Sequence, residues 1–371
     1  MVAALRRNNV DAELAATNDN GEHELDVPLS TLSEFEGVPV RFFKRDSPPG
    51  KGPLAHALRE FSIARSYTRW LNENIQNYQL IHVHALFSYM SSATMRMARK
   101  ESVPYFSHPI GSLDAWSLQQ SKLRKRIFLA LIERANLRHA KRVHCTTQLE
   151  SDQALQAVPG MATFVLPLGL DSPPLLADAN ARLKRRLKLH EGAQIILFLG
   201  RLHPKKGLDH LIDAVGVLNQ PQVHLVIAGS GDRTYQSMLK HKVEALGLAP
   251  RVTWLGHVSG DLKNECLQGS DLFALTSHAE NFGIAVIEAL AAQTPVLISP
   301  HVGLAQELEH HGIAKVTPLS ADCIAQRLDH LLSSQTRLEQ MGKLGRQYVQ
   351  TAHNWDSIAQ QLNAHYQQAI S

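Results

Sequence analysis

The sequence has few cysteines, and they form no recognisable pattern. Only three are present in the 371 residues, namely Cys145, Cys266 and Cys323, and they are far apart. An odd number at these spacings excludes a disulfide framework and a C-x-x-C metal site. We therefore expect a protein of a reducing compartment, the cytoplasm.

Long hydrophobic runs and a strong charge bias are also lacking. No segment approaches the roughly 18 apolar residues of a membrane-spanning helix, and the opening stretch "MVAALRRNNVDAEL" has no signal-peptide core. The formal net charge is only +4, which is too small for a protein that binds nucleic acid through its overall positive field. We expect a soluble protein with no nucleic-acid partner.

Several nucleotide-binding motifs are missing as well. The chain contains neither G-x-x-x-x-G-K-[ST] nor G-x-G-x-x-G, which excludes a Walker loop and a dinucleotide fingerprint. It also has no Asp-x-Asp pair, the usual carboxylate ligand of a metal that bridges a nucleotide diphosphate. A phosphate ligand would therefore have to be held by cations and helix dipoles. We expect no cofactor and no metal.

Short apolar, β-branched runs alternate with helix-patterned stretches, which predicts an α/β fold of parallel βαβ units. At this length two domains are expected. A stretch with a Pro-Pro pair and no strand pattern separates two series of strands and predicts a linker over residues 173–190. The expected strands are Asp11–Thr17, Val38–Lys44, Leu80–Leu86, Pro104–Pro109, Arg142–Thr147 and Thr163–Leu168, followed by "AQIILFLGRL", "VHLVIAGSG", "RVTWLGHV", "DLFALTS" and "TPVLIS" and a last one ending near Val316.

Two carboxylates, Glu280 and Glu288, flank the predicted start of a helix in "TSHAENFGIAVIEALAAQTPVLIS". A helix start offers unpaired N–H groups to an anion, and a carboxylate accepts two hydrogen bonds from a sugar diol. Backbone donors would come from Asn281, Phe282 and Gly283. The alternative is one N-capping acid and one solvated helix glutamate.

The stretch "FLGRLHPKKGLDHLIDAV" predicts a buried strand that ends at Gly200 and Arg201, then a short loop, then a helix opened by Lys206 and Gly207. Two cations there would bind a diphosphate through charge-assisted hydrogen bonds. The alternative is a pair of surface cations. A further turn, "VIAGSGD", places Gly229 and Gly231 after a strand, where small residues would let a ligand lie against the backbone.

Together these motifs, with "CTTQLE" and "VLPLGLD", resemble the family 4 retaining glycosyltransferases, also called glycosyltransferase group 1. The resemblance implies the GT-B fold, with two Rossmann-like domains that face a cleft. It implies an N-terminal acceptor-side domain over residues 1–172 and a donor-binding domain over 191–353. The segment 354–371 would be a terminal helix that packs back on the first domain.

The resemblance also implies roles for individual residues. Arg201 and Lys206 would bind the donor diphosphate, Glu280 and His108 would contact the transferred sugar, and Glu288 would hold the ribose. Further donor contacts are implied for Gly200, Gly229, Gly231, Asn281, Phe282, Gly283 and Ile284, with Gly256–Val258 near the base.

Two other features have plainer interpretations. His82 and His84 in "LIHVHALFSY" point to one face of a strand, but no third metal ligand follows at a suitable spacing, so we assign His84 an acceptor-side or packing role. The segment "SKLRKRIFLALIERANLRHAKRV" is a basic amphipathic helix whose only acid is Glu133. It suits anionic lipid at the inner membrane face, although a solvated basic face over an apolar underside is the commoner case.

The leading hypothesis is therefore metal-independent transfer of a sugar, with retained configuration, from a nucleotide diphosphate donor to a glycan or lipid-linked acceptor. A GT-B protein that binds a nucleotide sugar or a partner without turnover is the alternative. A sugar epimerase or phosphorylase is a third hypothesis. It is disfavoured because no pyridoxal lysine context is present and because an epimerase is not expected to carry the Glu280/Glu288 spacing.

The resemblance exposes one more absence. The family's first domain opens with a buried strand and a glycine-rich loop, whereas "MVAALRRNNVDAELAAT" predicts the following helix and then the second strand. Loss of a central strand would separate Asp11–Thr17 from Leu80–Leu86 and leave buried backbone groups unpaired. We expect such a strand and loop to be encoded upstream, or the chain to be a truncated relative.

Overall fold

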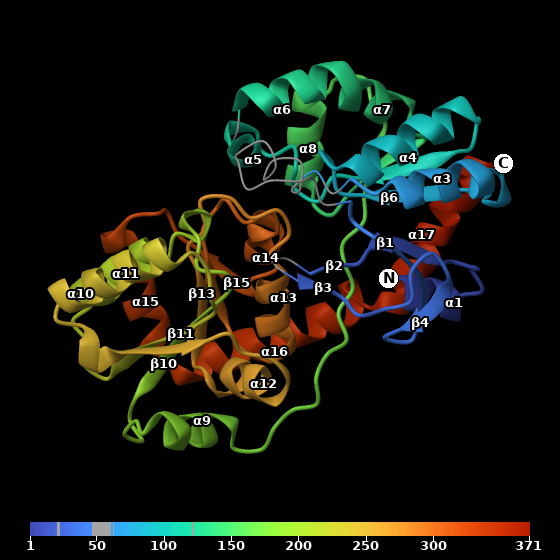
Figure 1. Ribbon diagram of the computed structural model, residues 1–371. Helices are drawn as coiled ribbons and strands as arrows, with labels where there is room; N and C mark the ends of the chain where they lie inside the picture. Colours follow the sequence, from blue (N-terminus) through green and yellow to red (C-terminus); the bar gives the residue numbers. More distant parts are fainter. Residues whose placement is uncertain (21–22, 47–60, 62, 121) are drawn as a thin grey trace. The chain divides into compact units, whose positions relative to one another are not determined.

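The computed structural model describes residues 1–20, 23–46, 61, 63–120 and 122–371. The chain divides into two compact units, shown in Figure 1. The first comprises Met1–Gly169 and Trp355–Ser371, and the second comprises Leu170–Asn354. Each unit is described below by itself.

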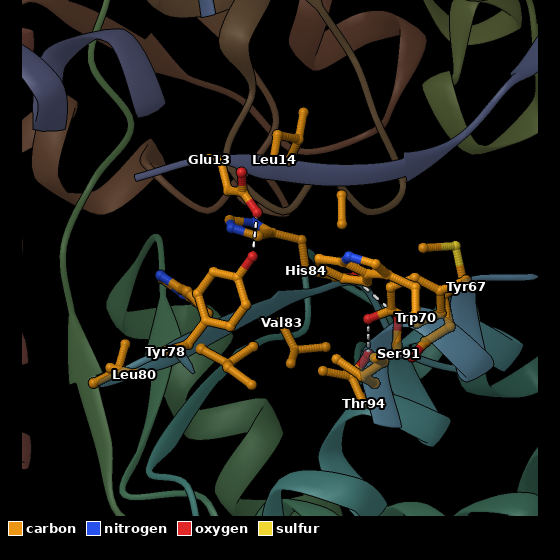
Figure 2. Close-up of a pocket in the computed structure, with 15 residues that line it drawn as sticks. Glu13, Leu14, Tyr67, Trp70, Tyr78, Leu80, Val83, His84, Ser91 and Thr94 are labelled. Atoms are coloured by element: carbon orange, nitrogen blue, oxygen red, sulfur yellow. Dashed lines mark hydrogen bonds between the residues drawn. The ribbon is translucent and has the colours of Figure 1, made fainter. Parts of the chain in front are cut away.

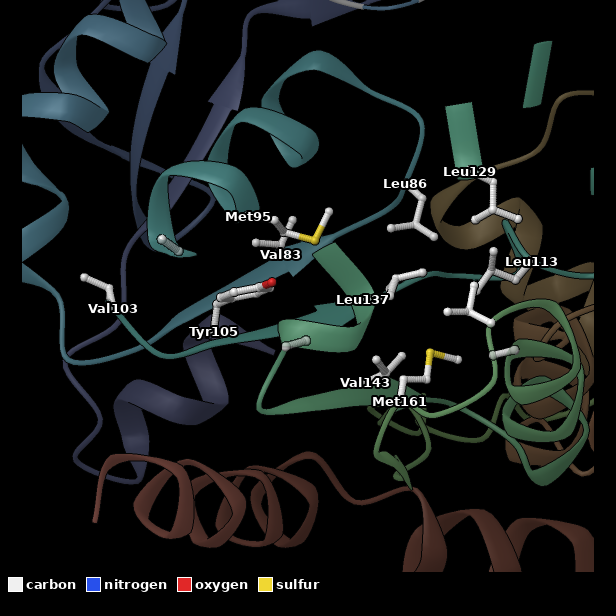
Figure 3. Close-up of a cluster of buried hydrophobic side chains, with 14 of the residues drawn as sticks. Val83, Leu86, Met95, Val103, Tyr105, Leu113, Leu129, Leu137, Val143 and Met161 are labelled. Atoms are coloured by element: carbon white, nitrogen blue, oxygen red, sulfur yellow. The ribbon is translucent and has the colours of Figure 1, made fainter. Parts of the chain in front are cut away.

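The first unit contains a four-stranded parallel sheet in the order β6-β7-β8-β9. Side chains alternate between the faces of each strand, so Val83 and His82 point to opposite sides. On one face Val83, Tyr105 and Val143 pack against helical residues that include Met95 and Leu137 (Figure 3). The strands are β6 Ile81–His84, β7 Tyr105–His108, β8 Arg142–Cys145 and β9 Thr163–Val165.

The other face of this sheet carries a second apolar cluster. Phe106 and Phe164 from the strands pack against Leu362 and Tyr366 of α17, together with Leu5 of α1. The C-terminal helix α17, Trp355–Ile370, also contacts α1, Val2–Arg7. The last helix of the chain therefore belongs to the core of the first unit.

A separate three-stranded sheet has the order β1-β5-β4, in which β1 and β5 are parallel and β4 is antiparallel. Strand β1 pairs with β5, and it lies in a different sheet from β6. The predicted strands Asp11–Thr17 and Leu80–Leu86 are therefore separated, as expected. The strands are β1 Leu14–Thr17, β4 Leu32–Phe35 and β5 Val38–Phe43, and β2 Asp19–Asn20 pairs with β3 His23–Glu24.

A cavity of about 250 Å³ lies beside these two strand edges, lined by residues of both β1 and β6 (Figure 2). Tyr67 and Trp70 of α3 also line it. At one side Tyr78 donates a hydrogen bond to the Glu13 carboxylate. The unpaired edges of the two sheets thus border the same cavity.

The second unit has a six-stranded, wholly parallel sheet in the order β12-β11-β10-β13-β14-β15. In this doubly wound order the direction of strand addition reverses between β10 and β13, and ligands bind at the carboxyl ends on either side of such a point. The strands are β10 Gln194–Leu199, β11 Val223–Ala228, β12 Val252–Gly256, β13 Leu272–Leu275, β14 Val296–Ile298 and β15 Ala314–Val316.

The segment 173–190, expected to be a linker, contains helix α9, Ala179–Leu187, which packs on α12 within the second unit. Leu183 is buried, and the Arg186 guanidinium donates to both oxygens of the Glu265 carboxylate at 2.8 and 3.1 Å. The helix forms because Ala179, Leu183 and Leu187 recur at the i, i+4 spacing of one helix face.

The remaining helices cover the faces of the sheets. Those of the first unit are α3 Arg65–Asn74, η1 Ile75–Asn77, α4 Tyr89–Lys100, α5 Ala115–Gln119, α6 Lys122–Phe128, the π-helical turn η2 Leu129–Glu133, α7 Arg134–His139 and α8 Gln148–Ala157. Those of the second unit are η3 Pro204–Lys206, α10 Leu208–Val217, α11 Arg233–Ala245, η4 Ala249–Arg251, α12 Gly260–Gly269, α13 Ile284–Ala291, α14 Ala305–His310, α15 Ala321–Leu332 and α16 Gln335–Ala352.

Candidate active site

The loop that follows β10 carries the two candidate phosphate-binding cations. Arg201 is exposed, and within the described residues no ion pair or hydrogen bond holds its guanidinium. The short helix η3 ends at Lys206, and Gly207, with φ +60°, is the N-cap of α10. A Cβ at Gly207 would lie 2.0 Å from the Thr276 carbonyl oxygen, so only glycine fits this turn.

The loop that follows β13 lies against the first loop. The Thr276 hydroxyl donates to the Gly207 carbonyl at 2.7 Å, and the His278 amide donates to the Lys205 carbonyl at 2.8 Å. Lys206 Nζ donates to the Glu280 carboxylate and forms an ion pair with it. The structure therefore brings together Lys206 and Glu280, which are 74 residues apart in the sequence.

The backbone of Glu280 is anchored on its other side by the segment after β14. Its amide donates to the His301 carbonyl at 3.0 Å, and its own carbonyl accepts from the Gly303 amide at 2.8 Å. The side chain keeps 17% of its surface exposed. Glu280 is thus held at the switch point with its carboxylate open to a ligand.

Glu288 lies in α13, on the turn next to the helix start. Its carboxylate accepts a hydrogen bond from Lys263 Nζ of α12 at 2.7 Å. Lys263 was not predicted from the sequence. The available signal was its place in the helix that directly follows β12, a strand of the same sheet. The two glutamates are therefore each paired with one lysine, and both pairs lie beside the N-terminus of α13.

The four residues before and at the start of α13 differ in their environments. Phe282 is buried and packs edge-on against His353, so its side chain belongs to the core. Gly283 has φ +84° and is the N-cap of α13, whereas Ile284 is exposed. Asn281 is partly buried. The predicted backbone donors therefore do lie at a helix N-terminus, where a positive dipole favours an anion.

Two of the candidate glycines lie in close contact with backbone. A Cβ at Gly229 would lie 1.8 Å from the Gly200 carbonyl oxygen, and one at Gly231 would lie 2.0 Å from that of Leu202. The Leu202 amide donates to the Ser230 carbonyl at 2.9 Å between the two loops. Small residues at these two positions thus let the loops after β10 and β11 pack closely.

A group that could bind a divalent metal lies close to the diphosphate candidates. Asp209, His210 and His278 each offer a ligand atom, and these atoms lie within 4.8 Å of one another. The His210 and His278 rings are 5.1 Å apart, and Tyr235 donates to Asp209 at 3.2 Å. Burial and the nearby His210 lower the pKa of His278, which favours its neutral, ligating form.

The remaining candidates, His108 and His84, lie in the first unit at the ends of β7 and β6. The strand register pairs them directly, and their Nδ1 atoms are 3.2 Å apart. Burial lowers the pKa of both rings, to about 4 for His84. No third ligand follows His82 and His84 at a suitable spacing in the sequence, but parallel pairing brings His108 beside them from the next strand.

Two family models match almost consecutive parts of the chain. Residues 1–169 match the glycosyl transferase 4-like domain, and residues 180–348 match the glycosyl transferases group 1. The chain belongs to the group 1 glycosyltransferases.

Curated relatives show partial similarity. An uncharacterized glycosyltransferase of Methanocaldococcus jannaschii is 35% identical over 50% of this chain and 47% of its own length. The mannosylfructose-phosphate synthase of Agrobacterium fabrum is 26% identical over 80% of this chain and 70% of its own length. A GDP-mannose-dependent phosphatidylinositol monomannoside mannosyltransferase of Mycobacterium tuberculosis is 30% identical over 55% of each chain. The chain thus spans about half of the length of several relatives.

Solved structures share the fold. The sucrose-phosphate synthase of Thermosynechococcus elongatus matches with a TM-score of 0.81 at 21% identity, over 99% of this chain and 91% of that one. Anabaena HepE in complex with UDP and glucose matches with a TM-score of 0.76 at 20% identity, over 98% and 94%. The fold is GT-B, as the sequence predicts.

Proposed function

We propose that the protein is a retaining glycosyltransferase that moves a sugar from a nucleotide diphosphate donor to a glycan or lipid-linked acceptor without a metal. The observation that carries the proposal is the pairing of Lys206 with Glu280 at the switch point of the second sheet, with Arg201 on the loop that also carries Lys206. Two cations and a carboxylate beside a helix N-terminus match a phosphate and a sugar bound side by side. Relatives named as GDP-mannose-dependent, or solved with UDP, support a nucleotide donor.

The residues would act as follows. Arg201 and Lys206 stabilise the negative charge that grows as the bond between the anomeric carbon and the diphosphate oxygen breaks. The acceptor oxygen bonds to the same face of that carbon, and its proton passes to the departing diphosphate oxygen. Glu280, which Lys206 already holds in place, accepts hydrogen bonds from the sugar.

The two glutamates should differ in what they bind. We expect Glu288→Gln to weaken binding of free nucleoside diphosphate about tenfold, since a charged hydrogen bond contributes about 1.5 kcal/mol or more. Glu280→Gln should leave this binding intact and lower the rate of sugar transfer. Calorimetry with the nucleoside diphosphate alone decides the matter, and equal losses in both variants would contradict the assignment of ribose to Glu288.

Chelation of metals should leave transfer intact. Arg201 and Lys206 supply the positive charge that a bridging metal would otherwise provide, so we expect the initial rate in excess EDTA to match the untreated rate. The comparison is made with Mg²⁺ restored as a control. A rate that falls at least tenfold in EDTA and returns with one metal would contradict this mechanism.

The proposal as a whole is tested with a panel of nucleotide sugars and acceptors. We expect one donor to yield a glycosylated product whose anomeric configuration, read from the NMR coupling of the anomeric proton, equals that of the donor. An inverted product would contradict retention. Donor binding with no transfer to any acceptor would favour the second candidate, a protein that binds without turnover.

We also propose that the first unit contacts anionic membrane through α6 and η2. Leu123, Ile127 and Leu131 recur every four residues, and their exposed fractions are 73%, 51% and 75%. Exposed basic residues flank them, namely Lys122, Arg124, Arg126 and Arg134. The apolar stripe is therefore exposed to solvent and is not packed against the protein. Such a stripe suits insertion between lipid chains, while the flanking cations contact the anionic headgroups. No helix among the described residues has the length and hydrophobicity to span a bilayer.

The double variant Leu123→Ser/Leu131→Ser should weaken binding to vesicles that contain anionic lipid at least tenfold. Each leucine that leaves water contributes about 1.5–3 kcal/mol, so loss of even part of this contact is measurable by vesicle sedimentation. The matched control is Val217→Ser/Leu344→Ser, which removes two exposed apolar side chains from the second unit. Equal losses in both double variants would refute the contact through this stripe.

A further inference from the structure

Four histidines gather on one face of the first sheet, the face that α17 covers. His84, His108 and His144 stand at one level across neighbouring strands, and His82 lies one step earlier on β6. The His84 and His108 rings are 5.2 Å apart, and the His108 and His144 rings are 4.2 Å apart and stacked. Parallel strands in register produce this row, because they place equivalent side chains next to one another.

The ring nitrogens of this group are poorly satisfied by the protein. His82 Nε2, His108 Nε2 and His144 Nδ1 are buried and have no hydrogen-bond partner. A buried polar atom without a partner costs about 1–3 kcal/mol. Among the residues that the structure describes, no carboxylate or thiolate joins the group of His82, His84 and His108. His82, His108 and His144 thus each keep one ring nitrogen hydrogen-bonded within the protein and one without a partner, and a bound ligand would offset part of that cost.

We infer that His82, His84 and His108 form a binding site for a divalent transition metal of the Zn²⁺ class. One nitrogen from each ring lies within 4.8 Å of the other two. The 3.2 Å between the Nδ1 atoms of His84 and His108 is close to the roughly 3.3 Å that two Zn–N bonds of about 2.05 Å span in a tetrahedral site. Neutral imidazole is a preferred ligand of Zn²⁺, Cu²⁺ and Ni²⁺.

Two further features complete the site. His82 Nδ1 is 2.7 Å from the Tyr366 hydroxyl of α17, a contact that fixes the ring and leaves Nε2 as the nitrogen without a partner, as outer partners of metal-binding histidines do. His82 and His84 also line the cavity beside β6, which gives an ion a path to the site (Figure 2). Three protein ligands leave the fourth coordination position of the metal open. This arrangement is typical of a metal that exchanges or reacts, whereas a structural metal usually has four protein ligands.

The test is calorimetric titration of Zn²⁺ into the chelator-treated full chain. We expect a site with a dissociation constant in the micromolar range or below. His84→Gln and His108→Gln should each weaken it more than 100-fold. Tyr366→Phe, which keeps the ring packing, should weaken it about 10–100-fold, the usual effect of losing an outer partner. The matched control His210→Gln alters the other histidine-containing group and should leave this site unchanged.

Circular dichroism of each variant without metal shows whether it is folded, and Co²⁺ gives a second reading through the visible absorption of a tetrahedral complex. Loss of that absorption in Tyr366→Phe and His84→Gln, with its retention in His210→Gln, would support the assignment. Absence of Zn²⁺ binding below 100 µM, or binding that survives both His84→Gln and His108→Gln, would overturn it. Because Zn²⁺ binding alone is measured, these results do not depend on whether the protein transfers sugar.

Discussion

Arg201→Ala and Lys206→Ala should each lower kcat for sugar transfer by about two orders of magnitude or more. In the proposed mechanism each cation binds the departing diphosphate, where charge grows only as the bond breaks, so its removal raises the free energy of the transition state more than that of the bound substrate. Loss of one such donor typically costs about 3–4 kcal/mol. Steady-state rates at saturating donor measure the effect.

The folded state should tolerate both changes. Arg201 is exposed, and the Lys206 side chain keeps 21% of its surface exposed. The control is Lys343→Ala, which removes an exposed cation of α16 that lies in none of the site loops. Near-normal kcat in both site variants would refute the diphosphate assignment, and an equal fall in Lys343→Ala would point to a non-specific charge effect.

Gly229→Ala should destabilise the second unit by about 3 kcal/mol or more. The residue has φ +148°, where a side chain is strained by about 1–3 kcal/mol. Its Cβ would also meet the Gly200 carbonyl oxygen at 1.8 Å, so the loops after β10 and β11 must part. Overpacking of this kind adds about 1–3 kcal/mol. Denaturant unfolding reports the loss of stability.

The neighbouring Gly200 provides the matched control. Its nearest potential contact is the Phe198 ring at 3.9 Å, and its φ is not positive. Gly200→Ala should therefore unfold at nearly the wild-type denaturant midpoint. If Gly229→Ala were as stable as Gly200→Ala, the two loops would not be packed as closely as described. If Gly200→Ala is stably folded but binds the donor more weakly, Gly200 contacts the bound donor.

The strands of the second sheet were predictable because buried parallel strands are continuous apolar runs of short length, as in "QIILFL" and "VHLVIA". Strand β4 was not predicted, since Leu32–Phe35 is short and half exposed. Helix α9 was obscured by the preceding Pro-Pro pair. Its apolar residues at four-residue spacing were the available signal, although four basic residues lie among them.

The sequence allowed the candidate residues of each loop to be predicted, but it did not allow the contacts between elements to be predicted. Arg201, Lys206 and Glu280 follow strands, so their place at one sheet edge could be expected. The pairing of Lys263 with Glu288 depends on how α12 packs, which no local pattern encodes. The histidine row depends on register between β6, β7 and β8, and the sequence separates His84 from His108 by 24 positions. Contacts between distant strands are fixed by the folded sheet, not by spacing.

Calorimetric titration of nucleoside diphosphates into the metal-free protein tests the central claim most directly. The account predicts that at least one nucleoside diphosphate binds with a stoichiometry of one, and that Arg201→Ala and Lys206→Ala each weaken this binding at least tenfold while Lys343→Ala does not. Failure of every nucleoside diphosphate to bind, or binding that both site variants leave unchanged, would contradict the account.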